Sequence, residues 1–200
     1  MRKLRTPILV VLLLFAGFAL ADPPQPPSGS AAAQPAAAQP AAPPPAAAQA
    51  AQTPMQPFTS TDGRFSAFFP GTLTLSSQPV HLKNGETTTL YEFSVSTSDD
   101  TASYMVMYND YLPDAVADGA QALLQRTENG AVAGKTLLGD QVIDLRGVPG
   151  RAYTVTDANG YTYTVHEFLA GTRLYQLVVT TAKGSTATQL DQFMNSFIIL

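Results

Sequence analysis

The stretch from residue 22 to residue 57 limits most strongly what this chain can fold into. It consists almost wholly of Pro, Ala, Gln and Ser, and Met55 is its one apolar residue larger than alanine. Such a segment cannot bury enough apolar surface to offset the entropy lost on folding. We therefore expect a disordered linker over 22–57, either a spacer or an extension without a task, and a single globular domain over 58–200.

The segment before this linker, residues 1–21, has the pattern of a secretory signal peptide. A basic region, an apolar run and small residues follow one another: Arg2, Lys3 and Arg5, then residues 8–18, then Ala19 to Ala21. The apolar run is shorter than the roughly 20 residues of a membrane span. We expect cleavage between Ala21 and Asp22, with an uncleaved anchor as the alternative. The mature protein should then be extracytoplasmic, periplasmic or secreted, without a stable membrane anchor.

The charge of the chain argues against nucleic-acid partners. The 11 Lys and Arg residues face 15 Asp and Glu residues, which gives a net charge of −4. Removing the three basic residues of the leader leaves eight against 15, a net charge of −7. The remaining basic residues are scattered singly, whereas phosphate binding draws on clusters. The chain has no cysteine, which excludes disulfides, thiolate metal sites and cysteine nucleophiles.

Strand patterns dominate residues 58–200. Aromatic and β-branched residues alternate with polar ones, and turn-forming residues separate the runs. Strands are expected at 64–69, 73–82, 87–97, 104–108, 135–145, 151–157, 161–169 and 173–181. Turns are expected at 83–86, where Asn-Gly accepts positive φ, at 147–150, at Asn159-Gly160 and around Gly171.

Two stretches change to helical spacing. The first begins near Asp114, carries Val116, Ala120, Leu123 and Leu124, and should end at Asn129-Gly130. The second should be capped by Ser185 or Thr186 and carries Leu190, Phe193 and Met194 ahead of an apolar tail at 197–200. Strands joined by hairpin turns, with one helix between them and one after them, predict an α+β fold: an antiparallel sheet with helices packed against it.

Short motifs that describe strand edges and turns lie at 62–66 with Phe69-Pro70, at 149–151, at 173–177 and at 193–197. Together, in this order, they resemble those of the PsbP-like superfamily, which includes a photosystem II extrinsic protein and exported bacterial proteins of the DcrB type. The resemblance covers residues 58–200. It implies an α/β/α sandwich and a non-catalytic accessory or assembly role in or on the cell envelope, and it carries over no functional residue. Many DcrB-type proteins are lipoproteins, whereas this chain lacks the cysteine that would bear the lipid.

The residues form no recognisable catalytic or metal motif. A Gly-x-Ser-x-Gly elbow is absent, and His81 and His166 are the only candidate bases near neutral pH. His166 and Glu167 are adjacent on a predicted strand, so their side chains point to opposite faces and cannot bind one ion together. The segment from Asp157 to Gly160 resembles the start of a calcium loop but lacks the later acidic ligand. We expect no catalytic residue, cofactor or metal, and a structural role for His166.

The tyrosines are the residues most open to a binding role. Tyr153, Tyr161 and Tyr163 share one face of the hairpin predicted around Asn159-Gly160. They could form an exposed aromatic stripe for a partner or a glycan, or they could be core beneath a helix. These three tyrosines and His166 are the weak binding candidates of the sequence.

The function that we expect is therefore an exported, non-catalytic binding or accessory module of the cell envelope. Its partner would be an unknown protein or another envelope component. Two alternatives remain open at this point: an enzyme whose site the sequence hides, and a structural protein of the envelope.

Overall fold

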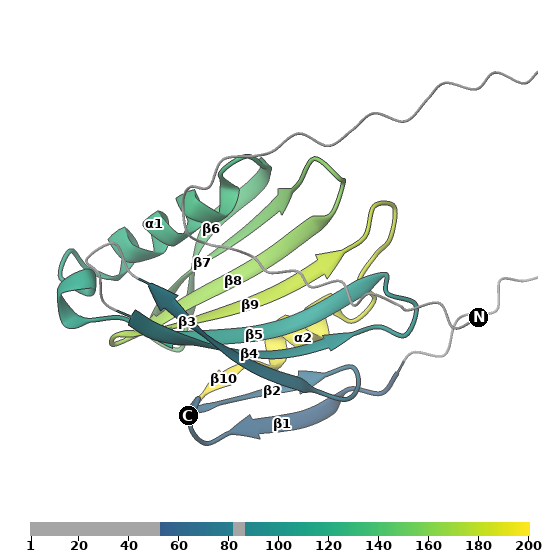
Figure 1. Ribbon diagram of the computed structural model, residues 1–200, viewed down its shortest axis with the longest axis horizontal. Helices are drawn as coiled ribbons and strands as arrows, with labels where there is room; N and C mark the ends of the chain where they lie inside the picture. Colours follow the sequence, from purple (N-terminus) through teal and green to yellow (C-terminus); the bar gives the residue numbers. More distant parts are fainter. Residues whose placement is uncertain (1–52, 82–86) are drawn as a thin grey trace, which may run out of the picture. The chain divides into compact units, whose positions relative to one another are not determined.

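A computed structural model describes residues 53–81 and 87–200 of the chain (Figure 1). The predicted signal peptide, the predicted linker up to residue 52 and the predicted turn at 83–86 lie outside the described residues. Within the described ranges, no helix is both long enough and apolar enough to cross a membrane.

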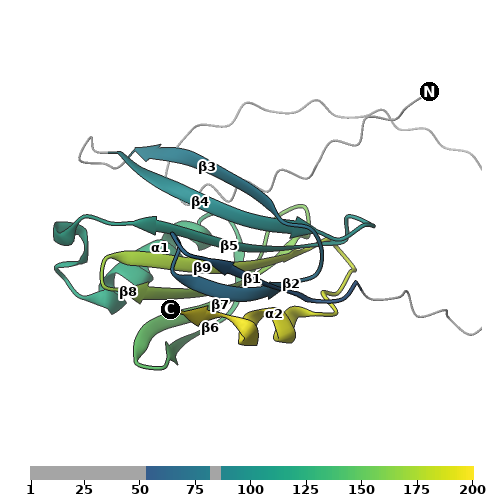
Figure 2. The same ribbon diagram turned by 90° about the horizontal axis from the view of Figure 1, so that it is seen from below.

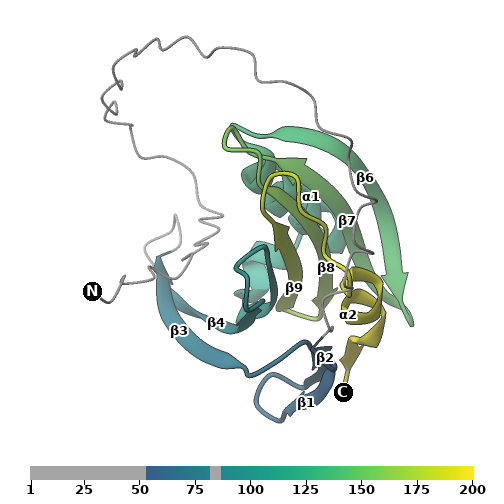
Figure 3. The ribbon, with the colours of Figure 1, turned by 90° about the vertical axis from the view of Figure 1, so that its right-hand side faces the viewer.

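Most of the strands form one seven-stranded sheet in which every neighbouring pair is antiparallel, in the order β3-β4-β5-β9-β8-β7-β6. The strands are β3 (Thr74–His81), β4 (Thr87–Ser96), β5 (Ala102–Asp110), β6 (Thr136–Leu145), β7 (Val148–Thr156), β8 (Thr162–Ala170) and β9 (Arg173–Thr181). In Figure 3 they follow one another from β6 on one side to β3 on the other. Two meanders, β3 to β5 and β6 to β9, are joined where β5 pairs with β9.

A second, three-stranded sheet was not expected from the sequence. It consists of β1 (Gln56–Ser60), β2 (Phe65–Phe69) and the short β10 (Ile198–Ile199), in the order β1-β2-β10. The sequence predicted β2 and an apolar C-terminal tail, but not that the tail pairs with β2 across more than 120 residues. Strand β1 begins two residues before the domain boundary predicted at Phe58.

The helices differ from the predicted ones mainly at their ends. The helix predicted from Asp114 is divided into a 3₁₀ turn, η1 (Pro113–Val116), and helix α1 (Ala120–Val132). Gly119, with φ of +92°, separates the two, and α1 continues through Gly130 instead of ending there. Helix α2 (Leu190–Ser196) begins later than the predicted caps at 185 or 186 and has no side-chain cap.

The large sheet is covered on both faces. Helix α1 packs on β7 and β8, over a face that we call the α1 face and that includes Tyr153, Val165 and Val178. The opposite face carries the main aromatic core, which includes Phe168 and Tyr175 and is covered by the small sheet and α2. Figure 2 shows α2 beside β2, with which it is in contact. The expected α+β class is confirmed, with a small sheet sharing the second covering layer with a helix.

The turn predicted at 147–150 lies slightly earlier in the chain. Arg146 and Gly147 have positive φ angles of 54° and 89° and connect β6 to β7. Gly150 is instead inside β7, paired with Phe168 of β8 and buried. A glycine is needed there because a side chain would press against the backbone of β8.

Candidate functional site

The three tyrosines proposed as a binding stripe lie on the α1 face. Tyr153 is 2% exposed and Tyr163 is 7% exposed, and both pack in one cluster with Ala131 of α1. Tyr161 is partly buried at the margin of the same cluster. The helix therefore covers Tyr153 and Tyr163 as core, and they form no exposed stripe.

His166 lies on the opposite face of the sheet from these tyrosines. It pairs with Leu177 of β9, and its ring meets that of Phe168 edge to face at 6.4 Å between centroids. Burial lowers the pKa of His166 below its ordinary value. The structure does not bring His166 together with the tyrosines, because strand alternation separates them.

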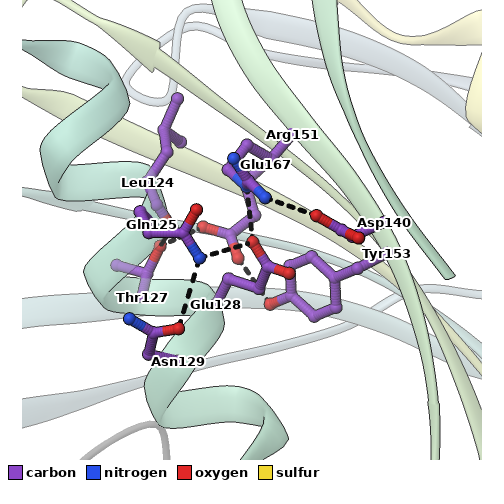
Figure 4. A network of polar contacts seen from close by, with 9 residues as sticks. All are labelled: Leu124, Gln125, Thr127, Glu128, Asn129, Asp140, Arg151, Tyr153 and Glu167. Carbon is purple, nitrogen blue, oxygen red and sulfur yellow. Dashed lines mark hydrogen bonds and ion pairs between the residues drawn. The ribbon is translucent and has the colours of Figure 1, made fainter. Parts of the chain in front are cut away.

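A network of charged and hydroxyl side chains is buried where α1 meets the sheet (Figure 4). Helix α1 contributes Thr127 and Glu128, β7 contributes Arg151 and Tyr153, and β8 contributes Glu167. The three strand residues, Arg151, Tyr153 and Glu167, point to the α1 face because they occupy the same alternating positions as the buried Val155 and Val165. We call these five residues, together with Asp140 of β6, the α1 network.

Glu167 is the central acid of the α1 network and is fully buried. Its two oxygens accept hydrogen bonds from the hydroxyls of Tyr153 and Thr127. The pKa of Glu167 is raised to about 7, mainly by burial and in smaller part by nearby Glu128, whereas the two hydrogen bonds and Arg151 act in the lowering direction. The buried Tyr153 beside this acid also has a raised pKa, first because of burial and then because of Glu167. Near neutral pH, Glu167 is thus close to the midpoint of its titration.

Arg151 holds the ionic part of the network. Its Nε donates to Oε2 of Glu128, and both side chains are buried. Its Nη2 donates to Oδ2 of Asp140 at 2.6 Å, and Asp140 belongs to the edge strand β6. The amide of Gln125 donates to the same Glu128 oxygen at 3.3 Å. A buried charge that is paired and hydrogen-bonded in this way is tolerated, whereas either partner alone would be costly.

Two buried neutral polar atoms of β9 lack hydrogen-bond partners within the described residues. Gln176 of β9 is directly opposite Glu167, and its buried Nε2 has no hydrogen-bond acceptor. Thr180, further along β9, has a buried hydroxyl without a partner. It lines a cavity of about 10 Å³, together with Thr101, Ser103 and Tyr161. That volume suits a single water molecule and is far too small for a substrate.

The described residues also contain no candidate metal site. No group of three or more His, Asp or Glu residues could hold an ion within the described ranges. Asp157, noted in the sequence for its likeness to a calcium loop, instead accepts the backbone N–H groups of Asn159 and Tyr161 at 2.9 Å and shapes the β7–β8 turn.

Three exposed apolar side chains lie together on the last strand of the sheet, β6. Leu137, Leu138 and Val142 are 42%, 62% and 63% exposed. A β-bulge at Leu138 shifts the register with β7, after which pairing is regular from Gly139 to Leu145. Within the described residues, no strand pairs with the outer edge of β6. We call this surface the β6 edge.

The sequence reasoning missed the α1 network, although a signal for it was present. Arg151 and Glu167 occupy strand positions whose neighbours, Val155 and Val165, are apolar. Opposite charges at such positions on two adjacent strands indicate that charged side chains are buried there next to each other. The helix residues Thr127 and Glu128 gave no comparable signal, because an amphipathic helix usually exposes such residues.

No protein-family model matches the chain, and no curated protein matches it. Among solved structures, the chain is similar to the cyanobacterial PsbP (CyanoP) of Synechocystis sp. PCC 6803. That similarity has a TM-score of 0.48 and 14% identity, and it covers 78% of this chain and 98% of the other.

Two further solved structures are similar to a lesser degree. One is a protein of unknown function from Pseudomonas aeruginosa, with a TM-score of 0.36 and 8% identity, covering 64% of this chain and 83% of that one. The other is from Bacteroides thetaiotaomicron, with a TM-score of 0.36 and 14% identity, covering 72% of this chain and 48% of that one. Similarities at this level do not indicate what the chain does.

Proposed function

We propose that this protein is an exported, non-catalytic binding module that holds an extended segment of a partner protein along the β6 edge. The observation that carries the proposal is an edge strand whose outer side pairs with no strand of the described residues and which carries three exposed apolar side chains, Leu137, Leu138 and Val142. Strand addition of this kind uses backbone hydrogen bonds for affinity and alternate side chains for specificity.

The two edges of the large sheet differ in a way that supports this role. Edge strands invite pairing with other chains, and proteins usually blunt them with proline, lysine or a bulge. The opposite edge, β3, contains Pro79, which cannot donate a backbone hydrogen bond. Strand β6 contains neither proline nor lysine, and its bulge at Leu138 leaves seven regularly paired residues from Gly139 to Leu145.

The side chains of the β6 edge indicate the chemistry of the partner segment. Leu137 and Val142 offer apolar contacts on the α1 face, where they lie opposite Val155 and Arg151 in the register. Asp140 is already paired with Arg151, whereas the exposed Asp144 is in no recorded ion pair among the described residues. A complementary segment would be extended, with apolar residues in alternate positions and a lysine or arginine opposite Asp144.

The buried acids of the chain support a binding role over an enzymatic one. Glu128 and Glu167 are engaged by Arg151, Thr127 and Tyr153 beneath α1. The cavity at Thr180 has room for about one water, and none of the residues that line it belongs to the α1 network. Export belongs to the proposal through the basic, apolar and small-residue pattern of residues 1–21.

A photo-crosslinking amino acid placed at position 142 tests the binding site in the native cell. We expect crosslinks from position 142 that map to one extended, apolar segment of a partner protein. Leu75 on β3 is the matched control, since it is 61% exposed on the opposite edge strand. A crosslinked dimer of this chain would show a second copy as the occupant. Equal crosslinking from positions 142 and 75 would contradict the proposed surface.

A further inference from the structure

The small sheet has one face that points away from the main aromatic core and carries no charged side chain. Phe65 and Phe69 of β2 belong to that core, so strand alternation turns the residues between them outward. The register of β1, β2 and β10 gives the outward residues, which are Pro57, Thr59, Ser66, Phe68 and Ile198, with Leu200 following β10. We call this surface the Phe68 face.

The Phe68 face is open to solvent within the described residues. Phe68 is 41% exposed and Leu200 is 56% exposed. Pro57, the direct partner of Phe68 in the register, is exposed as well. Single exposed apolar side chains are ordinary on a protein surface, whereas grouped ones are typical of interaction sites.

Pairing with a further strand is disfavoured on both sides of Phe68. Pro57 on β1 has no backbone N–H to donate. On the other side of β2, the backbone N–H of Phe68 donates to Oγ of Ser196 at 2.8 Å. A segment that binds here must therefore contact the side chains of the face and cannot extend the sheet.

The N-terminal linker of this chain has the chemistry that such a surface accepts. Residues 23–57 contain no charged side chain, and prolines recur from Pro23 to Pro45. Because polyproline II has three residues per turn, Pro40 and Pro43 would lie on the same side of that conformation. Proline-rich segments with this spacing dock on aromatic surfaces, and their stiffness reduces the entropy lost on binding. An uncharged segment also suits a face that offers no charged partner.

The linker joins the domain at a point from which it can reach the Phe68 face. The carbonyl oxygen of Thr53 accepts a hydrogen bond from Nε2 of Gln189 at 2.8 Å, which fixes the start of the described chain. Strand β1 begins three residues later, at the end of the small sheet where Phe68 lies. Residues 46–52 extend about 22 Å at about 3.1 Å per residue, whereas a five-residue strand is about 17 Å long. Residues 40–45 can therefore return to the Phe68 face, and their covalent attachment gives them a high effective concentration there.

From these observations we propose that residues 40–45 dock on the Phe68 face of the same chain. Pro40 and Pro43 contact the ring of Phe68 and the neighbouring Pro57. Docking shortens the free part of the linker from 22–52 to 22–39, so it limits how far the N-terminal end of the linker extends from the domain. The Phe68 face is not part of the β6 edge, so either proposal can fail without the other.

Paramagnetic broadening by a nitroxide on the linker tests the docking in the exported protein. The natural chain has no cysteine, so A38C provides a single labelling site just outside the docking segment. We expect the label to broaden the NMR amide signals of Ser66 and Ile198, and to leave the signal of Val142 on the β6 edge unchanged. Broadening centred on another surface would overturn the proposal.

Substitutions on both partners separate docking from the chance proximity of a linker. F68S should weaken docking by about five-fold, because the exposed part of the ring is no longer buried against the segment. L75S is the matched control, since it removes a leucine that is 61% exposed on β3, and it should leave the broadening unchanged. P40A/P43A leaves the domain itself untouched and should reduce the broadening as F68S does. Equal broadening in the parent, F68S and P40A/P43A would refute the docking.

A mixture of two preparations shows whether the segment comes from the same chain. One copy carries the nitroxide without isotope label, and the other carries the isotope label without the nitroxide. We expect no broadening of Ser66 and Ile198 in this mixture. Broadening as strong as in the singly labelled protein would show the linker of a neighbouring copy as the occupant and would overturn docking within one chain.

Discussion

Arg151 Nη2 lies 2.6 Å from Asp140 Oδ2, and this contact connects the edge strand of the sheet to the buried network beneath α1. The same guanidinium pairs with Glu128 of the helix. One side chain therefore joins α1, β6 and β7, three elements that follow one another in the chain. Its removal should affect the fold more than the loss of any surface ion pair.

Replacing Arg151 by Met should destabilise the protein by about 3–5 kcal/mol, because Glu128 would remain as an unpaired buried charge. Urea unfolding at neutral pH measures this cost. The double variant R151M/E128L should recover most of the loss, since it removes both charges from the interior. As a control, R126M breaks the exposed pair with Asp118 and should cost less than about 1 kcal/mol. Equal costs for R151M and R126M would contradict the structural role of Arg151.

Gly150 should tolerate no side chain. A Cβ at this position would lie 2.5 Å from the carbonyl oxygen of Glu167 and 2.6 Å from the ring of Phe168. The backbone of β8 cannot move aside as a flexible side chain could, so G150A should lower the free energy of unfolding by about 1–3 kcal/mol. The matched control is G139A on β6, where the added methyl meets nothing within 4 Å. Thermal unfolding of the two variants should separate them clearly, and similar melting temperatures would refute the predicted clash.

Asp110 should contribute stability that is lost in acid. Arg173 donates to both of its carboxylate oxygens at 2.7 Å, and mainly this hydrogen bonding lowers the pKa of Asp110. A lowered pKa in the folded state means that the contribution is present above the ordinary value of 3.8 and disappears as the pH falls below it. The stability difference between the parent and D110N should therefore shrink between about pH 5 and about pH 2.5. A difference that stays constant over this range would show that ionisation of Asp110 is irrelevant.

Replacing His166 by Gln should leave the fold and any captured partner intact. The ring of His166 packs edge to face on Phe168, on the face opposite the α1 network. We expect a loss of at most roughly 1–2 kcal/mol from the altered contact. Stability and partner crosslinking from position 142 should be measured on the same preparation. Loss of crosslinking at unchanged stability would give His166 a role in binding.

The leader and linker lead to a prediction that concerns residues outside the described ranges. If residues 1–21 are a signal peptide, intact-mass analysis of the exported protein should show a chain that begins at or near Asp22. Limited proteolysis should then trim the linker and leave a stable core. The structure places β1 from Gln56 onward, so the trimmed core should begin before that residue. A membrane-bound species that retains residues 1–21 would contradict cleavage.

Local patterns were enough to predict most of the strands and the fold class. The meander from β7 to β9 follows from alternating side chains and from turns at Asn159-Gly160 and Gly171, each within reach of its neighbours in the sequence. Helix boundaries were less accurate. Gly119 divides the helix predicted from Asp114 into η1 and α1, because its backbone has a positive φ that a continuous helix cannot include.

By itself, the sequence determined that the strands are antiparallel and that His166 and Glu167 point to opposite faces. These features depend on composition and on the two-residue period of a strand. Only the tertiary structure decided that β10 pairs with β2 and that α1 covers Tyr153. The structure also decided that Thr127 and Glu128 meet Arg151 and Glu167. These contacts join residues that are far apart in the chain, and their strength depends on burial, which is a property of the packed elements together and not of any one segment.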